Sequence, residues 1–328
     1  MYGERMHTTC PVIEESPTTM RRLRITVLRG GPSAEREISL ASGEAVADAL
    51  RRRGHDVFVS DVGPDNLAAL EQPADVVFPA LHGTFGEDGV LQEILERRGI
   101  RFVGSGSRAC ALAMDKVAAK QRVAELGIDT PAFEVVTNES LARGAPRLAP
   151  PVVVKPVAEG SSVLTTIVHE ADALLSAVRA VVERYGRALL ERFIAGDEIT
   201  VGIVGDRALP PICVRPRREF YDYQAKYQDD RTEYLFEAGH PQSLLARAQR
   251  LSRQVFAGLG CRHLARVDWM AESHGQDARA TQRLWFLEIN TIPGFTSHSL
   301  VPKAAARVGL PFDELVEQLV RMAAEESA

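Results

Sequence analysis

Three oxygen-bearing side chains toward the C-terminal end of the sequence have the spacing of a cation site. Asp268 lies in one predicted strand, and Glu288 and Asn290 lie two residues apart in the next. Because side chains alternate across a strand, Glu288 and Asn290 point to the same face, while Ile289 points to the core. Neighbouring carboxylates repel each other unless a cation lies between them, and a site without His or Cys suits Mg²⁺. The alternative is that Asp268 and Glu288 are an exposed pair on the protein surface and Asn290 acts as a capping residue.

Two lysines and a serine pair could bind the phosphates of a nucleotide. Lys155 ends an apolar strand, Ser161 and Ser162 follow in a glycine-containing loop, and Lys116 precedes them on a predicted helix. Exposed lysines are common, but a lysine at the end of an apolar strand is costly unless it meets an anion. Ammonium groups, hydroxyls and backbone amides together suit a triphosphate.

Two glycine-rich segments each follow a predicted strand. Residues 29–37 (RGGPSAERE) place backbone amides at the start of a helix, where an anion could bind, but Glu35 would instead hold an ammonium group. Residues 80–89 (ALHGTFGEDG) follow a strand end, where ligands gather in open α/β sheets. In that segment, His82 could contact a substrate or merely satisfy a loop carbonyl.

An arginine and a glycine lie next to the acidic set. Arg266 shares a strand face with Asp268, and Gly294 begins a tight loop beyond Asn290. An arginine and a glycine N–H could together stabilise the oxyanion of a tetrahedral intermediate. The sequence contains no GxSxG motif and no persuasive Cys–His arrangement, so covalent acyl-enzyme chemistry is not indicated.

Composition excludes several classes of protein. The chain has 328 residues, 45% hydrophobic and 25% charged, which indicates a globular protein of two or three domains. A net charge of −5 makes nucleic acid an unfavourable partner, and no apolar run is long enough to cross a membrane. Residues 1–22 lack the apolar core of a secretory signal, so we expect a disordered tail and a cytoplasmic protein. The cysteines lack metal-site spacing and are expected to be packed thiols: Cys10, Cys110, Cys213 and Cys261.

The pattern of apolar residues predicts an α/β fold. An alternation of strands and helices over residues 24–103 indicates a parallel sheet covered by helices. The expected strands are 24–28, 55–60, 75–79, 152–156, 188–193, 198–204, 264–270 and 284–289; the expected helices are 37–53, 90–98, 107–127, 170–185 and one at the C-terminus. Residues 272–282 are expected to form a polar hairpin loop.

In this order, the motifs resemble the D-alanine:D-alanine ligase family of the ATP-grasp superfamily. The resemblance runs from about Leu23 to the C-terminus and is carried by GGPSAEREISLASG, ALHGTFGEDG, MDK, VVKPVAEGSS, EFYDYQAKY and LEINTIPGFTSHSLVPKAA. It implies a Rossmann-like N-terminal domain at 23–104, a central ATP-grasp domain at 105–193 and a C-terminal ATP-grasp domain at 194–328. It also implies a homodimer.

The resemblance further implies where ATP and metal bind. Lys116, Lys155, Ser162 and Lys226 would contact phosphates; Glu191, Phe193, Ile194 and Glu198 would hold adenine and ribose; Asp268, Glu288 and Asn290 would bind two Mg²⁺ or Mn²⁺ ions. Residues 220–234 resemble the family's lid, in which Tyr227 would join Glu35 and Ser161 in a hydrogen-bonded closure that excludes water.

The implied reaction joins two D-alanines for peptidoglycan precursor synthesis. Glu35 would hold the ammonium group of the first D-alanine, with its carboxylate near His82, while that carboxylate attacks the γ-phosphate to give D-alanyl phosphate. The amino group of a second D-alanine, held near Ser299, would then attack the acyl carbon, with Arg266 and the Gly294 N–H stabilising the oxyanion. Positioning and electrostatics would provide most of the catalysis.

The resemblance leaves alternatives and one departure. Leu164 stands where the family commonly has glycine, which is unfavourable if that position requires a positive φ. A ligase that uses D-lactate or D-serine as acceptor is the nearest alternative, although the family associates Tyr227 with D-alanine. A non-catalytic nucleotide-binding regulator and a phosphotransferase that stops at the acyl phosphate are the others.

Overall fold

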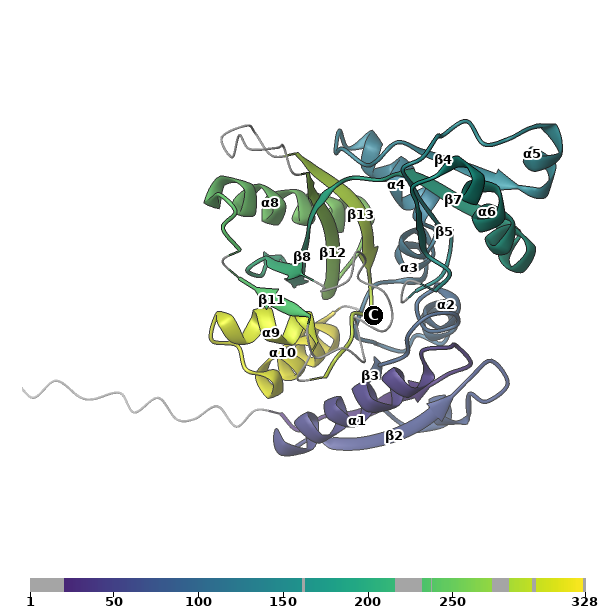
Figure 1. The fold of residues 1–328 in the computed structure, drawn as a ribbon. Coiled ribbons are helices and arrows are strands. Elements are labelled where there is room, and N and C mark those ends of the chain that lie inside the picture. Colours follow the sequence, from purple (N-terminus) through teal and green to yellow (C-terminus); the bar gives the residue numbers. More distant parts are fainter. Residues whose placement is uncertain are drawn as a thin grey trace, which may run out of the picture.

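The fold consists of three β-sheets and the helices packed on them (Figure 1). The computed structural model describes residues 21–160, 163–215, 232–236, 238–272, 283–296 and 299–326. Among these residues, no helix has the length and apolarity needed to span a bilayer.

The first sheet is the predicted parallel one. Its order is β2-β1-β3, with β1 at Arg24–Gly30, β2 at Asp56–Val62 and β3 at Val76–Pro79. Phe102 extends it by a parallel bridge to Val77. Helix α1 (Arg36–Arg52) buries Val46, Ala47, Ala49 and Leu50 against β1, and η1 (Ala68–Glu71) and α2 (Val90–Arg97) follow.

The single helix predicted over residues 107–127 is wrong, because the structure has two helices there. Helix α3 (Ser107–Met114) ends at Asp115, whose backbone is extended, and α4 (Lys116–Glu125) starts at the next residue. The Asp115 side chain accepts a hydrogen bond from the Ala118 amide, as an N-cap does. The Lys116 amide donates to the Val157 carbonyl, which fixes the start of α4 beside the strand that carries Lys155.

The second sheet is antiparallel, in the order β4-β7-β5-β6. The predicted strands β5 (Val152–Pro156) and β7 (Arg187–Arg192) lie in its middle. They are flanked by β4 (Phe133–Thr137) and β6 (Thr166–Val168), neither of which was predicted. Helix α6 (Ala171–Tyr185) packs Val178 and Val182 onto this sheet, and α5 (Asn138–Arg143) lies beside β4.

The third sheet carries the predicted acidic strands. Its order is β11-β10-β8-β12-β13, with β9 also paired to β8. These strands are β8 (Gly196–Val204), β9 (Arg207–Ala208), β10 (Ile212–Arg215), β11 (Glu233–Leu235), β12 (Leu264–Glu272) and β13 (Leu284–Asn290). Helix α8 (Gln242–Gly258), absent from the prediction, covers one face, where Trp269 is fully buried and donates from Nε1 to Ser252 Oγ at 2.8 Å.

The C-terminal end is two helices instead of the single predicted one, because Gly309 with φ +78° and Pro311 separate them. Helix α9 is Leu300–Arg307 and α10 is Phe312–Glu325, and α10 packs on α1. His55 and Glu317 pair inside that contact, so the end of the chain is tied to the first sheet. The three sheets lie within the three predicted domains, whose boundaries stay a prediction.

Candidate active site in the central cleft

Two adjoining cavities of about 370 Å³ each occupy the cleft between the sheets. The first lies between the glycine-rich loops of the parallel sheet and the end of β13, and the second lies between the two antiparallel sheets. Both are lined by the same four residues, Lys116, Glu159, Gly160 and Glu288. A ligand in one cavity would therefore meet a ligand in the other at these side chains.

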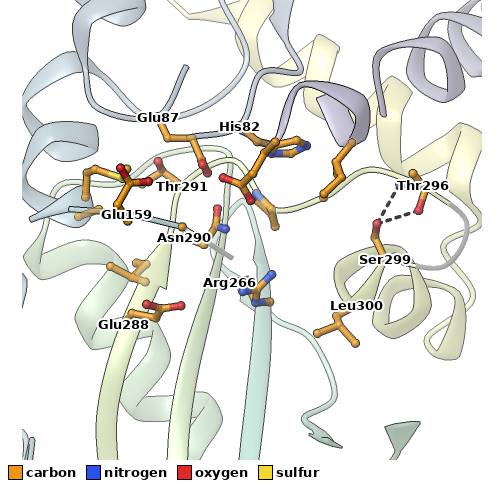
Figure 2. A pocket seen from close by; sticks show the side chains of 18 of the residues that line it. His82, Glu87, Glu159, Arg266, Glu288, Asn290, Thr291, Thr296, Ser299 and Leu300 are labelled. Carbon is orange, nitrogen blue, oxygen red and sulfur yellow. Dashed lines mark hydrogen bonds between the residues drawn. The ribbon is translucent and has the colours of Figure 1, made fainter. Parts of the chain in front are cut away.

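The predicted acidic set lies on one face of the β12–β13 pair. Asp268 is directly opposite Glu288, and Arg266 is directly opposite Asn290. Figure 2 shows Arg266, Glu288 and Asn290 projecting toward the first cavity. The register therefore brings these oxygen-bearing side chains together on one face of the sheet, while their role in binding a metal ion stays a prediction.

Local contacts hold each of these side chains in place. Asp268 accepts two hydrogen bonds from Arg266 Nε, at 3.0 and 3.2 Å, one from Arg266 Nη2 at 2.9 Å, and one from Thr200 Oγ1 at 2.6 Å. The Glu288 carboxylate lies 3.5 Å from Lys116 Nζ. Asn290 Oδ1 accepts from the Ile292 amide at 3.0 Å. The carboxylates thus lie among fixed cations at the junction of the two cavities.

A buried Lys–Glu–Lys triad lies beneath the second cavity. Glu191 pairs through Oε1 with Lys120 and through Oε2 with Lys155, the latter at 2.5 Å. Burial favours the neutral form of Glu191, but the two lysines outweigh it and lower the pKa of that carboxyl. Burial likewise opposes the charge of Lys155, yet Glu191 and Glu288 raise its pKa. Lys120 is fully buried, and burial lowers its pKa to about 8 despite Glu191. The triad keeps a charged Lys155 at the cavity wall.

The Glu35 carboxylate lies against two glycines of different segments. A Cβ on Gly160 would be 2.6 Å from Glu35 Oε2, and one on Gly83 would be 3.0 Å from the same atom. Glu35 precedes α1 and lines the first cavity. Only a residue without a Cβ permits so close an approach of the carboxylate to the backbone. Gly160 therefore allows Glu35 to contact the loop that follows β5.

His82 lines the same cavity, and both of its ring nitrogens face protein atoms. Nδ1 lies 3.1 Å from the Ile292 carbonyl and Nε2 lies 3.2 Å from Ser42 Oγ. A carbonyl can only accept, so Nδ1 carries the hydrogen and Nε2 accepts from Ser42. Burial lowers the pKa of His82, which agrees with a neutral ring. The ring therefore links α1 to the loop after β13.

Glu87 and Glu159 lie nearby and are absent from the predicted set of site residues. Glu87 is buried and accepts from the Gly83 amide at 2.6 Å; burial, followed by the charge of Glu35, raises its pKa to about 8. Burial also raises the pKa of Glu159, whose carbonyl accepts from Lys116 Nζ at 2.6 Å. Glu87 belongs to the glycine-rich segment 80–89. Its position after Gly83 and Gly86 in that segment could have marked it as a candidate site residue. Lys120 was also missed, although it follows Lys116 by one helical turn.

The remaining predicted residues fall into three groups. Gly294 and Ser299 line the first cavity, where Ser299 Oγ accepts from the Thr296 amide at 3.0 Å (Figure 2). Phe193, Ile194 and Glu198 line the second cavity together with Lys155 and Glu191. Ser161, Ser162, Lys226 and Tyr227 lie outside the described residues.

Leu164 has a positive φ, the backbone conformation that is unfavourable for leucine. This φ is +49°, in the left-handed region that residues with a Cβ adopt only at a cost in conformational energy. The side chain is 39% exposed, so little burial offsets that cost. The backbone after β5 therefore has the form that glycine favours, although leucine occupies it.

A parallel sheet joined to two antiparallel sheets, with lysines and carboxylates between the latter two, defines an ATP-grasp protein. Residues 60–105 match the family model for the D-ala D-ala ligase N-terminus, and residues 123–321 match that for the D-ala D-ala ligase C-terminus. The chain belongs to the D-alanine–D-alanine ligase family.

Named relatives and solved structures agree with this placement. The chain is 44% identical to the D-alanine–D-alanine ligase of Syntrophotalea carbinolica, covering 92% of this chain and 96% of the relative, and 43% identical to that of Chromohalobacter salexigens, covering 94% and 97%. It is similar to the Bacillus anthracis D-alanine–D-alanine ligase complexed with ATP (TM-score 0.77, 31% identity, 92% and 97% coverage). It is also similar to the VanG D-Ala:D-Ser ligase of Enterococcus faecalis (TM-score 0.79, 27% identity, 92% and 100% coverage).

Proposed function

We propose that this protein joins two D-alanines to D-alanyl-D-alanine with ATP, through a D-alanyl phosphate, and so supplies peptidoglycan precursor synthesis. The observation that carries the proposal is the junction of the two cavities at Lys116, Glu159, Gly160 and Glu288. A triphosphate that extends from the second cavity would reach a carboxylate in the first at this junction.

ATP occupies the second cavity in this proposal. Phe193, Ile194 and Val153 would provide apolar surface for the base, and Glu198, in the wall of the same cavity, would accept a hydrogen bond from the ribose. Lys155 and Lys116 supply positive charge for the phosphates. The Glu191 carboxylate is already shared between two lysines, so we propose that it acts by positioning Lys155, and that the backbone of the segment after it meets the base.

The acidic face of β12 and β13 fits divalent cations. Asp268, Glu288 and Asn290 present oxygen donors only, and fixed cations from Arg266 and Lys116 compensate the two carboxylates. We propose that these three residues hold two Mg²⁺ or Mn²⁺ ions, which neutralise phosphate charge when bound.

The amino acids occupy the first cavity. Glu35 binds the ammonium group of the first D-alanine, and His82 fixes the wall beside its carboxylate. That carboxylate attacks the γ-phosphate, which releases ADP. Ser299, at the start of α9, holds the carboxylate of the second D-alanine, whose amine attacks the acyl carbon. Arg266 and the Gly294 N–H stabilise the oxyanion, and phosphate leaves. By the family resemblance, Ser162 and Lys226 would contact the phosphates, and Tyr227 would join Glu35 and Ser161 in a hydrogen-bonded closure.

The test measures ADP release and product with D-alanine, and with D-lactate, D-serine or L-alanine offered as second substrate. We expect D-alanine-dependent ADP release in equal amount to D-alanyl-D-alanine. Predominant D-alanyl-D-serine or D-alanyl-D-lactate would favour the alternative ligases, ADP without ligation would indicate a phosphotransferase, and ATP binding without ADP would indicate a regulator. A homodimer in the cytoplasm is proposed from the family alone, and light scattering measures the oligomeric part of that proposal.

A further inference from the structure

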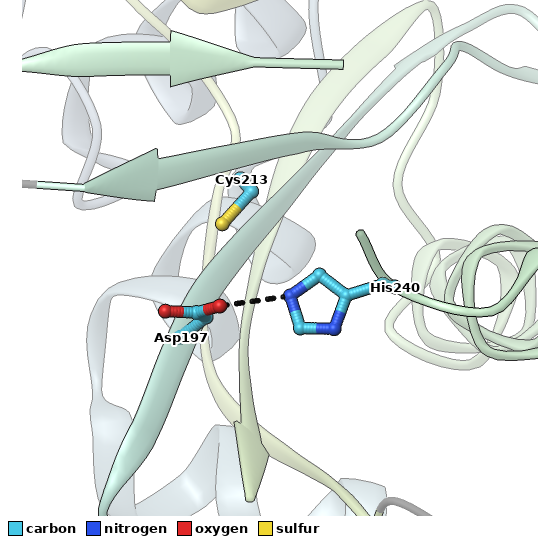
Figure 3. Close-up of side chains that lie close together, drawn as sticks. All are labelled: Asp197, Cys213 and His240. Carbon is cyan, nitrogen blue, oxygen red and sulfur yellow. Dashed lines mark ion pairs between the residues drawn. The ribbon is translucent and has the colours of Figure 1, made fainter. Parts of the chain in front are cut away.

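Asp197, Cys213 and His240 form a compact cluster outside the acidic face of β12 and β13 (Figure 3). Their carboxylate oxygen, thiol sulfur and imidazole nitrogen all lie within 4.8 Å of one another. Asp197 is in β8, Cys213 is in β10, and His240 comes just before α8. Three separate segments therefore bring together three different metal-ligand side chains.

The cluster faces α8, on the other side of the sheet from the proposed nucleotide site. Cys213 is paired with Ile199, which belongs to the core that includes residues of α8. The next pair, Val214 and Glu198, lines the second cavity. Because side chains alternate along strands, Cys213 points away from that cavity. Asp197 also reaches the rim of the cavity, so the cluster borders the nucleotide site without belonging to it.

The donor set has the chemistry of zinc rather than magnesium. Thiolate, imidazole and carboxylate bind Zn²⁺ and similar borderline cations, whereas Mg²⁺ prefers oxygen ligands alone. Cys213 is 3% exposed, so its sulfur lies inside the fold beside the other two side chains. His240 Nε2 lies 3.0 Å from Asp197 Oδ2, so nitrogen and oxygen already face each other.

We propose that Asp197, Cys213 and His240 bind one thiophilic divalent cation of the Zn²⁺ type. On binding, a metal–sulfur bond forms and the thiol proton leaves to solvent. The imidazole binds through Nε2 and carries its hydrogen on Nδ1, and Asp197 supplies one oxygen. A water molecule completes the tetrahedral set.

Arg215 competes with the cation for Asp197. Its Nη2 donates to Asp197 Oδ2 at 3.1 Å and to the Ala238 carbonyl at 3.0 Å. The Arg215 side chain is 42% exposed, so it can turn toward solvent when a metal ion replaces its charge. Removing the guanidinium should therefore strengthen metal binding.

Co²⁺ is the probe for this site, because its thiolate complexes have a sulfur-to-cobalt charge-transfer band and its tetrahedral complexes absorb strongly in the visible region. Titration of the full-length protein in the presence of excess Mg²⁺ should show one equivalent of Co²⁺ with both bands, the release of about one proton, and displacement by Zn²⁺. Arg215→Ala should bind about five times more tightly, since a partly exposed ion pair no longer opposes the metal.

Cys213→Ser should remove the charge-transfer band, and His240→Gln should weaken Co²⁺ binding at least tenfold. Cys261→Ser, which changes a buried thiol elsewhere, is the matched control and should leave both bands unchanged. Thermal unfolding of each variant shows whether it is folded. The proposal is overturned if the folded wild type gives no thiolate band, or if the band survives in Cys213→Ser.

Discussion

The Gly160 backbone lies so close to the Glu35 carboxylate that a methyl group at residue 160 would be 2.6 Å from Glu35 Oε2. The contact joins the parallel sheet to the loop after β5, across the first cavity. We therefore expect Gly160→Ala to displace Glu35 from the proposed ammonium site and to lower kcat/KM for D-alanine about tenfold or more. Because the atom that must move ends a flexible side chain, the melting temperature should change little.

Gly63→Ala is the control for this substitution, because a Cβ there meets nothing within 4 Å. Steady-state kinetics with varied D-alanine and varied ATP separate the two sites. An unchanged kcat/KM for D-alanine in Gly160→Ala would contradict the proposed role of Glu35.

Glu288 pairs with Asp268 across β12 and β13 and lies at the junction of the two cavities. Glu288→Gln keeps the shape but removes one of the charges proposed to hold divalent cations. We expect turnover to fall by orders of magnitude while the thermal unfolding transition is preserved. Glu233→Gln, in β11 of the same sheet, is the matched control. Near-normal turnover of Glu288→Gln at saturating Mg²⁺ would refute the metal assignment.

The sequence predicts those features that depend on local pattern and misses those that depend on contacts between distant residues. That Glu288 and Asn290 share one face of their strand follows from strand alternation, which needs only local pattern. The boundary between α3 and α4 at Asp115 does not follow from local pattern. It depends on the hydrogen bond from the Lys116 amide to the Val157 carbonyl, which lies far along the chain. Helix α8 was missed in a stretch without a recognised motif. Lys120 was missed because its partner Glu191 becomes a neighbour only in the folded protein.

Leu164 adopts φ +49° where the family commonly has glycine. Leu164→Gly should raise the free energy of unfolding by up to about 1 kcal/mol, since it relieves a left-handed backbone costing about 1–2 kcal/mol but adds flexibility to the unfolded chain. Leu175→Gly is the matched comparison, because Leu175 has the same 39% exposure but lies inside α6. The free energy of unfolding of Leu175→Gly should fall by about 1 kcal/mol. Denaturant titration measures both, and a loss of stability in Leu164→Gly would show that the leucine side chain stabilises the loop.

Glu87 makes stability depend on pH in the opposite sense from a paired carboxylate. Its pKa rises to about 8 in the folded protein, from an ordinary value of 4.5, because of burial and the charge of Glu35. Between those values the folded state retains a proton that the unfolded state has lost, so this group lowers stability as pH rises, by up to about 1.4 kcal/mol per pH unit. Glu87→Gln, which resembles the protonated form, should therefore be more stable than the wild type at pH 8, with the difference vanishing below about pH 4.5. Chemical denaturation across this range measures the difference, and a constant difference would contradict the raised pKa.

The Lys120–Glu191–Lys155 triad allows a structural role and a binding role to be separated. Glu191→Gln leaves two buried ammonium groups without their shared carboxylate, and we expect a loss of about 3–5 kcal/mol in the free energy of unfolding. Lys155→Met leaves Lys120 and Glu191 as a balanced pair, so its stability should fall much less, whereas ATP affinity should fall at least tenfold because the phosphates lose a cation. Equilibrium unfolding and nucleotide titration on the same two variants provide the comparison. If Lys155→Met bound ATP normally, Lys155 would not be a phosphate ligand, and if Glu191→Gln were as stable as the wild type, the triad would not hold that lysine in place.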